Sequence, residues 1–281
     1  MNRLEHPQKM PVMAHLVLGY PNLEESLHTA EIYIRAGVQV LELQIPFSHP
    51  TADGPVITAA CREAVRQGVT VRDCIGAIRD LYARYPEQEI MVMSYVNPVY
   101  SFGFQKFVDE MSRLGIRHLI IPDLPVDHAD FPGFENLESL RRQIKLVPVL
   151  AANISDARLE KLLGMGFDFF YLMSDFKITG STFSLHPRLK EVIERIRQHK
   201  PHTIESSLDR NLPITDNQQP ITNRKIGIGF GISTPEQARL VTEEADLAII
   251  GSALIQAQRE GRLEDYLETL KIAFDAATEP V

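Results

Sequence analysis

The sequence contains little cysteine, no excess of positive charge and no long hydrophobic segment. Its two cysteines, Cys61 and Cys74, have no metal-ligand spacing and are too few for a framework of disulfide bridges. The formal net charge of −8 argues against nucleic acid or an anionic membrane as a main partner. No window reaches the ~18 uninterrupted apolar residues of a membrane span, and the N-terminal MNRLEHPQKMP lacks the apolar run of a signal peptide. These features predict a soluble, cytoplasmic protein.

Short apolar runs rich in β-branched residues alternate along the chain with longer stretches of helical period. The expected strands are 12–18, 38–45, 90–95, 118–121, 146–150, 168–173, 225–230 and 247–250. The expected helices are 24–36, 56–67, 71–85, 104–114, 134–143, 156–164, 187–198 and 234–241, with terminal helices from Ser252 and Leu263. Eight strand–helix units with short connections predict an α/β fold, a single (β/α)8 TIM barrel with extra helices over residues 1–281. An open doubly wound sheet is the alternative.

One connection is long. Residues 199–224 are polar, contain proline and show no clear period, which predicts a mobile inserted loop before the seventh strand. The segment enters the N-terminal end of that strand, the face of a barrel where stability rather than catalysis usually resides. A tolerated insertion and a partner-binding segment both remain open.

The second expected strand carries a carboxylate at a position typical of catalysis. Side chains alternate along a strand, so Leu41, Leu43 and Ile45 share one face while Glu42 and Gln44 share the other. The three apolar side chains suit packing against outer helices, which places Glu42 and Gln44 in the barrel mouth. A largely desolvated carboxylate there suits proton transfer, although a structural Glu with a buried partner is the alternative.

The loop that follows this strand, residues 46–55, contains three prolines and the segment Ala52-Asp53-Gly54. The small neighbours of Asp53 would let a ligand approach closely. Asp53 could instead cap the helix that begins near Val56, a common use of Asp. His49 is a candidate third acid–base group, although a loop histidine is more often a surface residue.

Glycine-rich segments follow the seventh and eighth expected strands. Gly229-Phe230-Gly231-Ile232-Ser233 and Gly251-Ser252-Ala253 occupy the positions where many barrels bind phosphate through backbone N–H groups and a helix N-terminus. The spacing of Gly227, Gly229 and Gly231 is not that of a dinucleotide fingerprint. After the sixth strand, Ile178-Thr179-Gly180 lies in a polar loop long enough to act as a lid. Tyr95, Asn97 and Asp123 complete the predicted rim.

Taken together, these segments resemble the α subunit of tryptophan synthase over nearly the whole chain. The most specific match is LELQIPFSHPTADGPVI, which is similar to the family's signature around its two catalytic carboxylates. Tyr95-Val96-Asn97-Pro98, Pro122-Asp123-Leu124-Pro125, Ile178-Thr179-Gly180 and both glycine segments then follow in the family's order.

The resemblance implies retro-aldol cleavage of indole-3-glycerol phosphate to indole and glyceraldehyde 3-phosphate, in the last steps of tryptophan biosynthesis, with no metal or organic cofactor. It implies that Glu42 moves protons at the substrate and that Asp53 hydrogen-bonds the indole N–H. Thr179 would hydrogen-bond Asp53 when the lid closes. The implied substrate-binding residues are Tyr95, Tyr171, Thr179, Gly180, Phe230, Gly231, Gly251 and Ser252.

The resemblance also implies a partner, a pyridoxal-phosphate-dependent β subunit that receives indole through a tunnel in an αββα heterotetramer. The sequence departs from the family at Gln44, where glycine is usual, and at His49, which replaces an Asp at the subunit boundary. Asp175-Phe176-Lys177 stands where the family commonly has glycine before its lid motif, and Tyr20 replaces the Asp of a Gly-Asp-Pro turn. The departures at His49 and in the lid keep open a stand-alone lyase that releases indole and a barrel that uses another phosphorylated substrate. A non-catalytic regulatory partner of a β subunit is a further alternative, although the retention of both Glu42 and Asp53 argues against it.

Overall fold

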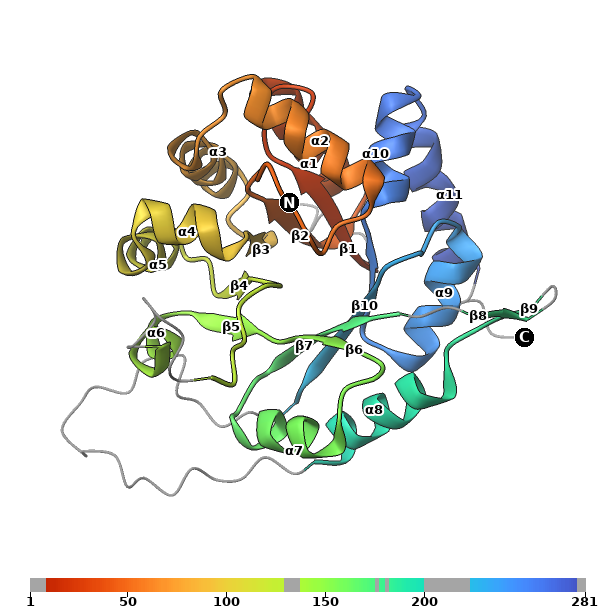
Figure 1. The fold of residues 1–281 in the computed structure, drawn as a ribbon. Coiled ribbons are helices and arrows are strands. Elements are labelled where there is room, and N and C mark those ends of the chain that lie inside the picture. Colours follow the sequence, from red (N-terminus) through yellow and green to blue (C-terminus); the bar gives the residue numbers. More distant parts are fainter. Residues whose placement is uncertain (1–8, 129–136, 175–176, 180–181, 200–222, 277–281) are drawn as a thin grey trace, which may run out of the picture.

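Parallel strands form the centre of the molecule and helices surround them (Figure 1). The computed structural model describes residues 9–128, 137–174, 177–179, 182–199 and 223–276. The strands of the main sheet are β1 Met10–Val17, β2 Val38–Gln44, β3 Glu89–Met93, β4 His118–Ile120, β5 Lys145–Val147, β6 Val149–Ala151, β7 Phe169–Met173, β10 Lys225–Gly229 and β11 Leu247–Ile250. They pair in the order β5-β4-β3-β2-β1-β11-β10-β7-β6, and each pairing is parallel.

Pro148 divides the expected fifth strand into β5 and β6. Proline has no N–H to donate to a neighbouring strand, which interrupts the hydrogen-bond ladder at this residue. β5 pairs with β4, and β6 pairs with β7. The segment from Lys145 to Ala151 therefore connects the two ends of the sheet and closes it into the predicted barrel, and the open doubly wound alternative is excluded.

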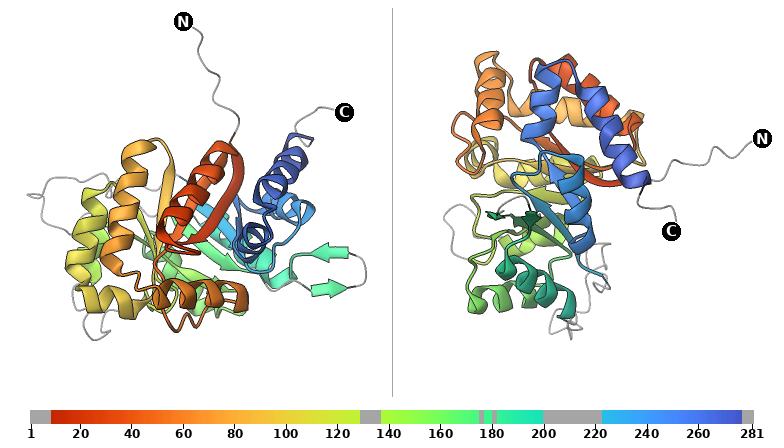
Figure 2. Two further views of the ribbon diagram at one scale, coloured as in Figure 1. Left: turned by 90° about the horizontal axis from the view of Figure 1, so that it is seen from above. Right: turned by 90° about the vertical axis from the view of Figure 1, so that its right-hand side faces the viewer.

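Helices cover the outside of this barrel in two views at right angles (Figure 2). They are α1 Leu23–Arg35, α2 Pro55–Arg66, α3 Val71–Arg84, α4 Val96–Phe102, α5 Phe104–Arg113, α6 Leu137–Gln143, α7 Asp156–Gly164, α8 Pro187–Gln198, α9 Pro235–Glu244, α10 Ser252–Arg259 and α11 Leu263–Asp275. Sequence signals fix several of their ends. Thr234, for example, caps α9 by accepting from the Gln237 N–H, with Pro235 at the first helical position.

Besides the division of the fifth strand, one helix and one hairpin differ from the expectation. Helix α4 was not predicted, because Pro98 falls inside it; a proline in the first turn of a helix loses no hydrogen bond, and Gly103 ends the helix with a positive φ of 97°. The predicted polar lid loop contains an antiparallel hairpin, β8 Lys177–Thr179 with β9 Thr182–Ser184. This hairpin projects from the body of the barrel in Figure 2.

Alternation along the strands sorts the apolar side chains into two cores. Leu41, Leu43 and Ile45 pack outward with the helices, as predicted from β2. A second cluster fills the inside of the barrel and consists of Met13, Val40, Met91, Met93, Tyr95, Ile120, Val147, Phe169, Tyr171, Leu247 and Ile249. Inward-facing residues at the carboxyl ends of the strands therefore lie above a closed apolar floor.

Polar contacts hold the opposite, N-terminal end of the barrel. Asp168 lies 3.2 Å from His118 Nε2 and accepts from Lys145 Nζ at 2.5 Å. Burial acts to raise the pKa of Asp168, but these two partners outweigh it and hold the pKa below its usual range.

The buried Arg224 lies at the same end of the barrel and donates to the carbonyl oxygens of Leu163, Phe167 and His199. Arg224 thereby ties together the two described ends of the inserted segment, whose residues 200–222 lie outside the described part of the chain.

Among the helices of the described residues, none combines the length and apolar composition that a membrane crossing requires.

Glycine at position 227 allows the barrel interior to pack closely. A Cβ atom there would lie 2.8 Å from Ile249 Cδ1 and 2.9 Å from Phe169 Cζ. We predict that Gly227→Ala lowers the free energy of unfolding by about 1–3 kcal/mol through overpacking, as measured by urea unfolding. The matched control is Gly76→Ala in α3, where a Cβ would meet nothing within 4 Å. That substitution should leave stability unchanged or raise it by about 0.5–1 kcal/mol. Equal stability of Gly227→Ala and the parent protein would contradict this account of the core.

Candidate active site

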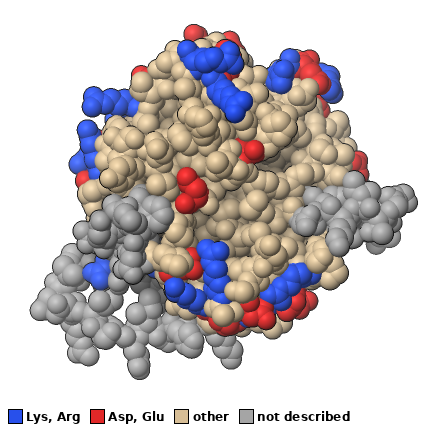
Figure 3. Space-filling model, in the orientation of Figure 1, with Lys and Arg blue, Asp and Glu red and all other residues tan. Residues whose placement is uncertain are grey.

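A cavity of about 230 Å³ lies at the carboxyl ends of the barrel strands. Most of its wall is apolar, with Ile57, Met93, Ile120, Pro122, Val149, Tyr171, Phe230, Ile232 and Ile249 among the lining residues. In the view of Figure 3, Lys and Arg lie mostly toward the edge of the molecule, whereas the central surface is largely uncharged with a few acidic residues. A phosphorylated ligand of this cavity would therefore be held by local groups rather than by a broad positive field, as the net charge of −8 also indicates.

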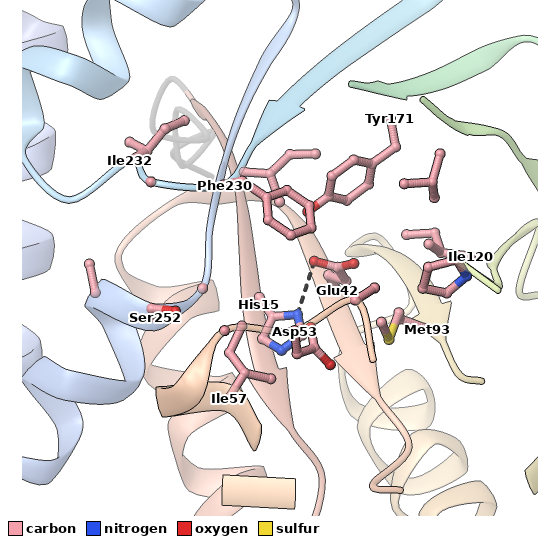
Figure 4. A pocket seen from close by; sticks show the side chains of 18 of the residues that line it. His15, Glu42, Asp53, Ile57, Met93, Ile120, Tyr171, Phe230, Ile232 and Ser252 are labelled. Carbon is pink, nitrogen blue, oxygen red and sulfur yellow. Dashed lines mark hydrogen bonds and ion pairs between the residues drawn. The ribbon is translucent and has the colours of Figure 1, made fainter. Parts of the chain in front are cut away.

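Glu42 points into this cavity from β2, as the alternation argument predicted (Figure 4). Its side chain is almost fully buried, and its Oε2 atom lies 3.0 Å from Nδ1 of His15. The pairing of the strands explains this contact, because His15 of β1 and Glu42 of β2 are register partners. Glu42 is thus a desolvated carboxylate with one hydrogen-bonding partner, itself a titratable group.

The surroundings of His15 favour its protonated form. Burial alone would lower the pKa of the ring, but the charge of Glu42 and the hydrogen bond to it, with smaller effects from Asp53 and Gln44, raise the pKa above its ordinary value of 6.5. His15 and Glu42 are thus two titratable side chains in direct contact, both buried in the wall of the cavity.

Asp53 belongs to the cavity and does not cap α2. The residue that precedes this helix is Gly54, which makes no side-chain capping bond. The Oδ2 atom of Asp53 instead accepts from Gln44 Nε2 at 2.7 Å and from the Tyr95 hydroxyl at 2.9 Å. The Tyr95 oxygen in turn accepts from the Ala52 N–H at 3.0 Å. Residues on β2 and at the end of β3 thus fix the carboxylate, which excludes the helix-cap interpretation.

The predicted phosphate-binding segments lie side by side on another wall of the cavity. Gly231 and Ser233 follow β10, and Gly251 and Ser252 follow β11, with Gly251 as the residue before α10. Phe230 has a positive φ of 71°, a conformation that side chains other than glycine rarely adopt, and Gly231 continues it at 83°. Strained backbone at the mouth of a cavity often marks a ligand site. Here the two residues with positive φ lie in the segment that brings Gly231, Ile232 and Ser233 to the cavity wall.

Tyr171 closes the floor beside Phe230. The two rings meet edge to face, with centroids 6.0 Å apart. A Cβ atom at Gly229 would lie 2.6 Å from the Tyr171 hydroxyl, so glycine at this position leaves room for the tyrosine. Burial, with the nearby charges of Glu42 and Asp53, raises the pKa of Tyr171 far above its ordinary value. Tyr171 therefore stays neutral in the cavity.

Other predicted site residues are not among the described residues that line the cavity. Tyr95 is buried, and its hydroxyl donates to Asp53 and accepts from the Ala52 N–H. Thr179 ends β8, and Gly180 lies outside the described residues. His49 is exposed, and its Nδ1 pairs with Ser48 Oγ at 2.8 Å. Asp123 accepts from the Val96 N–H at the start of α4.

Sequence reasoning overlooked His15. The signal was present, since His15 is the polar residue in the otherwise apolar strand β1, Met10–Val17. Its meaning depends on the register between β1 and β2, which sets His15 beside Glu42 and which no pattern within one strand reveals.

Comparison with known proteins shows which family this chain is similar to. The family model described as tryptophan synthase alpha chain matches residues 1–207. A tryptophan synthase alpha chain from Synechocystis is 30% identical, and the match covers 96% of this chain and 93% of the relative. One from Thermosynechococcus vestitus is also 30% identical, covering 97% and 96%. A solved chain from Aquifex aeolicus superposes with a TM-score of 0.74 at 26% identity, covering 96% and 95%. A Mycobacterium tuberculosis tryptophan synthase structure gives 0.72 at 25% identity, covering 94% and 92%.

Proposed function

The chain belongs to the tryptophan synthase alpha chain family, and on that premise we propose that it cleaves indole-3-glycerol phosphate to indole and glyceraldehyde 3-phosphate in the cytoplasm. The observation that carries the proposal is the joint presence of Glu42, Asp53 and the backbone segments at Gly231 and Gly251 in one largely apolar cavity. The apolar wall suits an indole ring, and the backbone N–H groups suit a phosphate.

Glu42 moves the protons of this reaction. The C–C bond between indole C3 and the glycerol chain breaks only after C3 is protonated, because the ring must then accept the electrons of the bond. Glu42 delivers that proton and removes one from the glycerol hydroxyl, whose carbon becomes the aldehyde. One proton is given and one is taken, so the carboxyl group ends the cycle as it began. A buried carboxyl group in contact with a second titratable group is suited to both tasks.

Asp53 stabilises the positive charge that develops on the indole ring. Protonation at C3 places positive charge on the indole nitrogen, and an ionised Asp53 stabilises that charge by accepting from the N–H. Its hydrogen bonds from Gln44 and Tyr95 hold the carboxylate in place before substrate arrives. Tyr171 and Phe230 offer flat apolar surface for the ring.

The phosphate occupies the wall formed by Gly231, Ser233, Gly251 and Ser252. The N-terminus of α10 supplies unpaired N–H groups and the positive end of a helix dipole. In this proposal Gly180 of the predicted lid would also hold the phosphate, and Thr179 would hydrogen-bond Asp53 when the lid closes. No step requires a metal or an organic cofactor.

The partner we propose is a pyridoxal-phosphate-dependent β subunit in an αββα assembly that accepts the released indole. A second candidate, a stand-alone lyase, is favoured by one observation. Gln44 and Tyr95, both in the described part of the barrel, hold Asp53 by hydrogen bonds. Such a site has less need of a partner to order the catalytic carboxylate.

Indole release from indole-3-glycerol phosphate, measured with and without the cognate β subunit, tests the proposal. We expect release in both cases, with a large increase when the β subunit is added. Equal rates would favour the stand-alone enzyme. Absence of release in both cases would contradict the lyase function and leave a regulatory partner of the β subunit.

Glu42→Gln preserves shape but cannot transfer a proton. We predict that kcat falls by at least ~10²-fold while KM changes little, because general acid–base catalysis contributes on that scale. The matched control is Glu89→Gln at the N-terminal end of β3, beside Lys225, which should keep the parent kcat. Near-parental turnover by Glu42→Gln would refute the assignment of Glu42.

Gly251→Val tests the phosphate wall. A Cβ at this position already lies 3.1 Å from Ile57 Cδ1, and the larger valine side chain would enter the space assigned to phosphate. We predict that KM for indole-3-glycerol phosphate rises at least ~10-fold, since one charge-assisted hydrogen bond contributes about 1.5–3 kcal/mol. Binding of indole alone should change much less. Gly164→Val on the exposed end of α7, where a Cβ has open space, is the control for stability. An unchanged KM would place the phosphate elsewhere.

A further inference from the structure

His15 is an unusual member of this cavity. Of the described residues that line it, His15 is the sole side chain able to carry positive charge, and it stands against two carboxylates, Glu42 and Asp53. Two negative charges in a largely apolar cavity repel each other and are poorly solvated. The protonation state of the His15 ring therefore determines how far the negative charge of the two carboxylates is balanced.

One nitrogen of the ring contacts Glu42, and the other is without a partner among the described residues. Nδ1 lies 3.0 Å from Glu42 Oε2, while Nε2 is buried and makes no hydrogen bond in the described structure. Gln44 binds Asp53 through Nε2, and its own Oε1 atom is likewise buried without a partner. Buried polar atoms normally find partners, so these two atoms still have hydrogen-bonding capacity that the described residues do not use. Gln44 also acts to favour the protonated form of His15.

We propose that His15 is a positioning residue that acts through Glu42: it orients the carboxylate and holds the proton that Glu42 delivers to the substrate. The inference rests on the proposed lyase function of the same site. It extends that function by assigning the transferable proton to the His15–Glu42 pair rather than to Glu42 alone.

The proton balance is simple. At rest the pair holds one proton, shared between Nδ1 of His15 and Oε2 of Glu42. As Glu42 protonates indole C3, the proton leaves Nδ1 and the ring becomes neutral. Glu42 then removes the proton of the glycerol hydroxyl as the C–C bond breaks, and this proton returns the pair to its initial state. Gln44 remains able to accept from a protonated Nε2 while it holds Asp53, which links the two carboxylates through neutral and cationic groups.

The pH dependence follows from the groups that face His15. Glu42 of β2 and Asp53 of the following loop favour the charged ring, and Tyr171 of β7 remains neutral. The N-terminus of α10 lies close by at Gly251, where a Cβ would be 3.5 Å from His15. Because the folded-state pKa of His15 is raised, the pair keeps its proton at pH 6.5 and loses it only as the pH rises through that higher value. Turnover should fall along the same limb.

Two substitutions of His15 test its two tasks, which are to orient the Glu42 carboxylate and to hold the proton. His15→Asn places an amide nitrogen where Nδ1 was, so that it retains a hydrogen bond to Glu42 but cannot hold a proton. His15→Phe removes both. The control is His118→Asn, which alters a comparable histidine–carboxylate pair at the opposite end of the barrel. For each variant, kcat and KM for indole-3-glycerol phosphate would be measured from pH 5.5 to 9.5 on the full chain with the β subunit present.

For both His15 variants we expect the alkaline limb of kcat to move to lower pH by about one unit or more. This shift corresponds to at least a ~10-fold loss of kcat on that limb, with KM within ~3-fold of the parent value. His118→Asn should leave the limb in place. Restoration of the parental profile by His15→Asn would show a purely structural hydrogen bond and overturn the proposal.

A measurement without substrate distinguishes failure of this inference from failure of the lyase assignment. The ring ¹⁵N shifts of His15, identified by their loss in His15→Asn, would be titrated in the ligand-free protein and in Glu42→Gln. We expect a pKa above 6.5 in the parent protein and a lower one in Glu42→Gln. A parental value at or below 6.5 would overturn the proposal whether or not the protein releases indole.

Discussion

The register between neighbouring parallel strands is the constraint on which the site depends. Once β1, β2 and β3 are paired and the sheet has closed through the segment around Pro148, alternation decides which side chains enter the barrel and at what height. His15 and Glu42 meet because they are register partners, whereas Leu41 and Leu43 turn outward to the helices. A shift of one residue in either strand would reverse these directions and abolish the site.

Within that frame, the chemistry of the cavity depends on charge balance. Burial makes an isolated carboxylate costly, and the cavity holds two. Each has a hydrogen-bonding partner on the barrel wall: His15 for Glu42, and Gln44 with Tyr95 for Asp53. Gln44 is one of the positions at which the sequence departs from the family pattern, and its side chain donates to a proposed catalytic group, Asp53. The departure therefore bears on how Asp53 is held.

Much of this could be predicted from the sequence, because the informative signals were local. Period and turn residues located the strands, alternation placed Glu42 and Gln44 inside, and glycines after β10 and β11 indicated the backbone-lined wall. What escaped prediction depended on distant partners. The contact between His15 and Glu42 requires the strand register, and the role of Asp53 depends on its hydrogen bond with Tyr95, which follows the neighbouring strand β3. Helix α4 was missed because Pro98 suggests a break, although proline in a first helical turn is compatible with the helix.

The contacts of Arg224 have a consequence for how the chain could be redesigned. Its buried guanidinium joins the carbonyl of His199 to those of Leu163 and Phe167, so the barrel closes beneath the inserted segment whatever the length of chain between. The entropy of loop closure grows only slowly with loop length. This end of the molecule, remote from Glu42 and the cavity, is therefore suited to carry a grafted peptide, a fused domain or a new pair of chain termini.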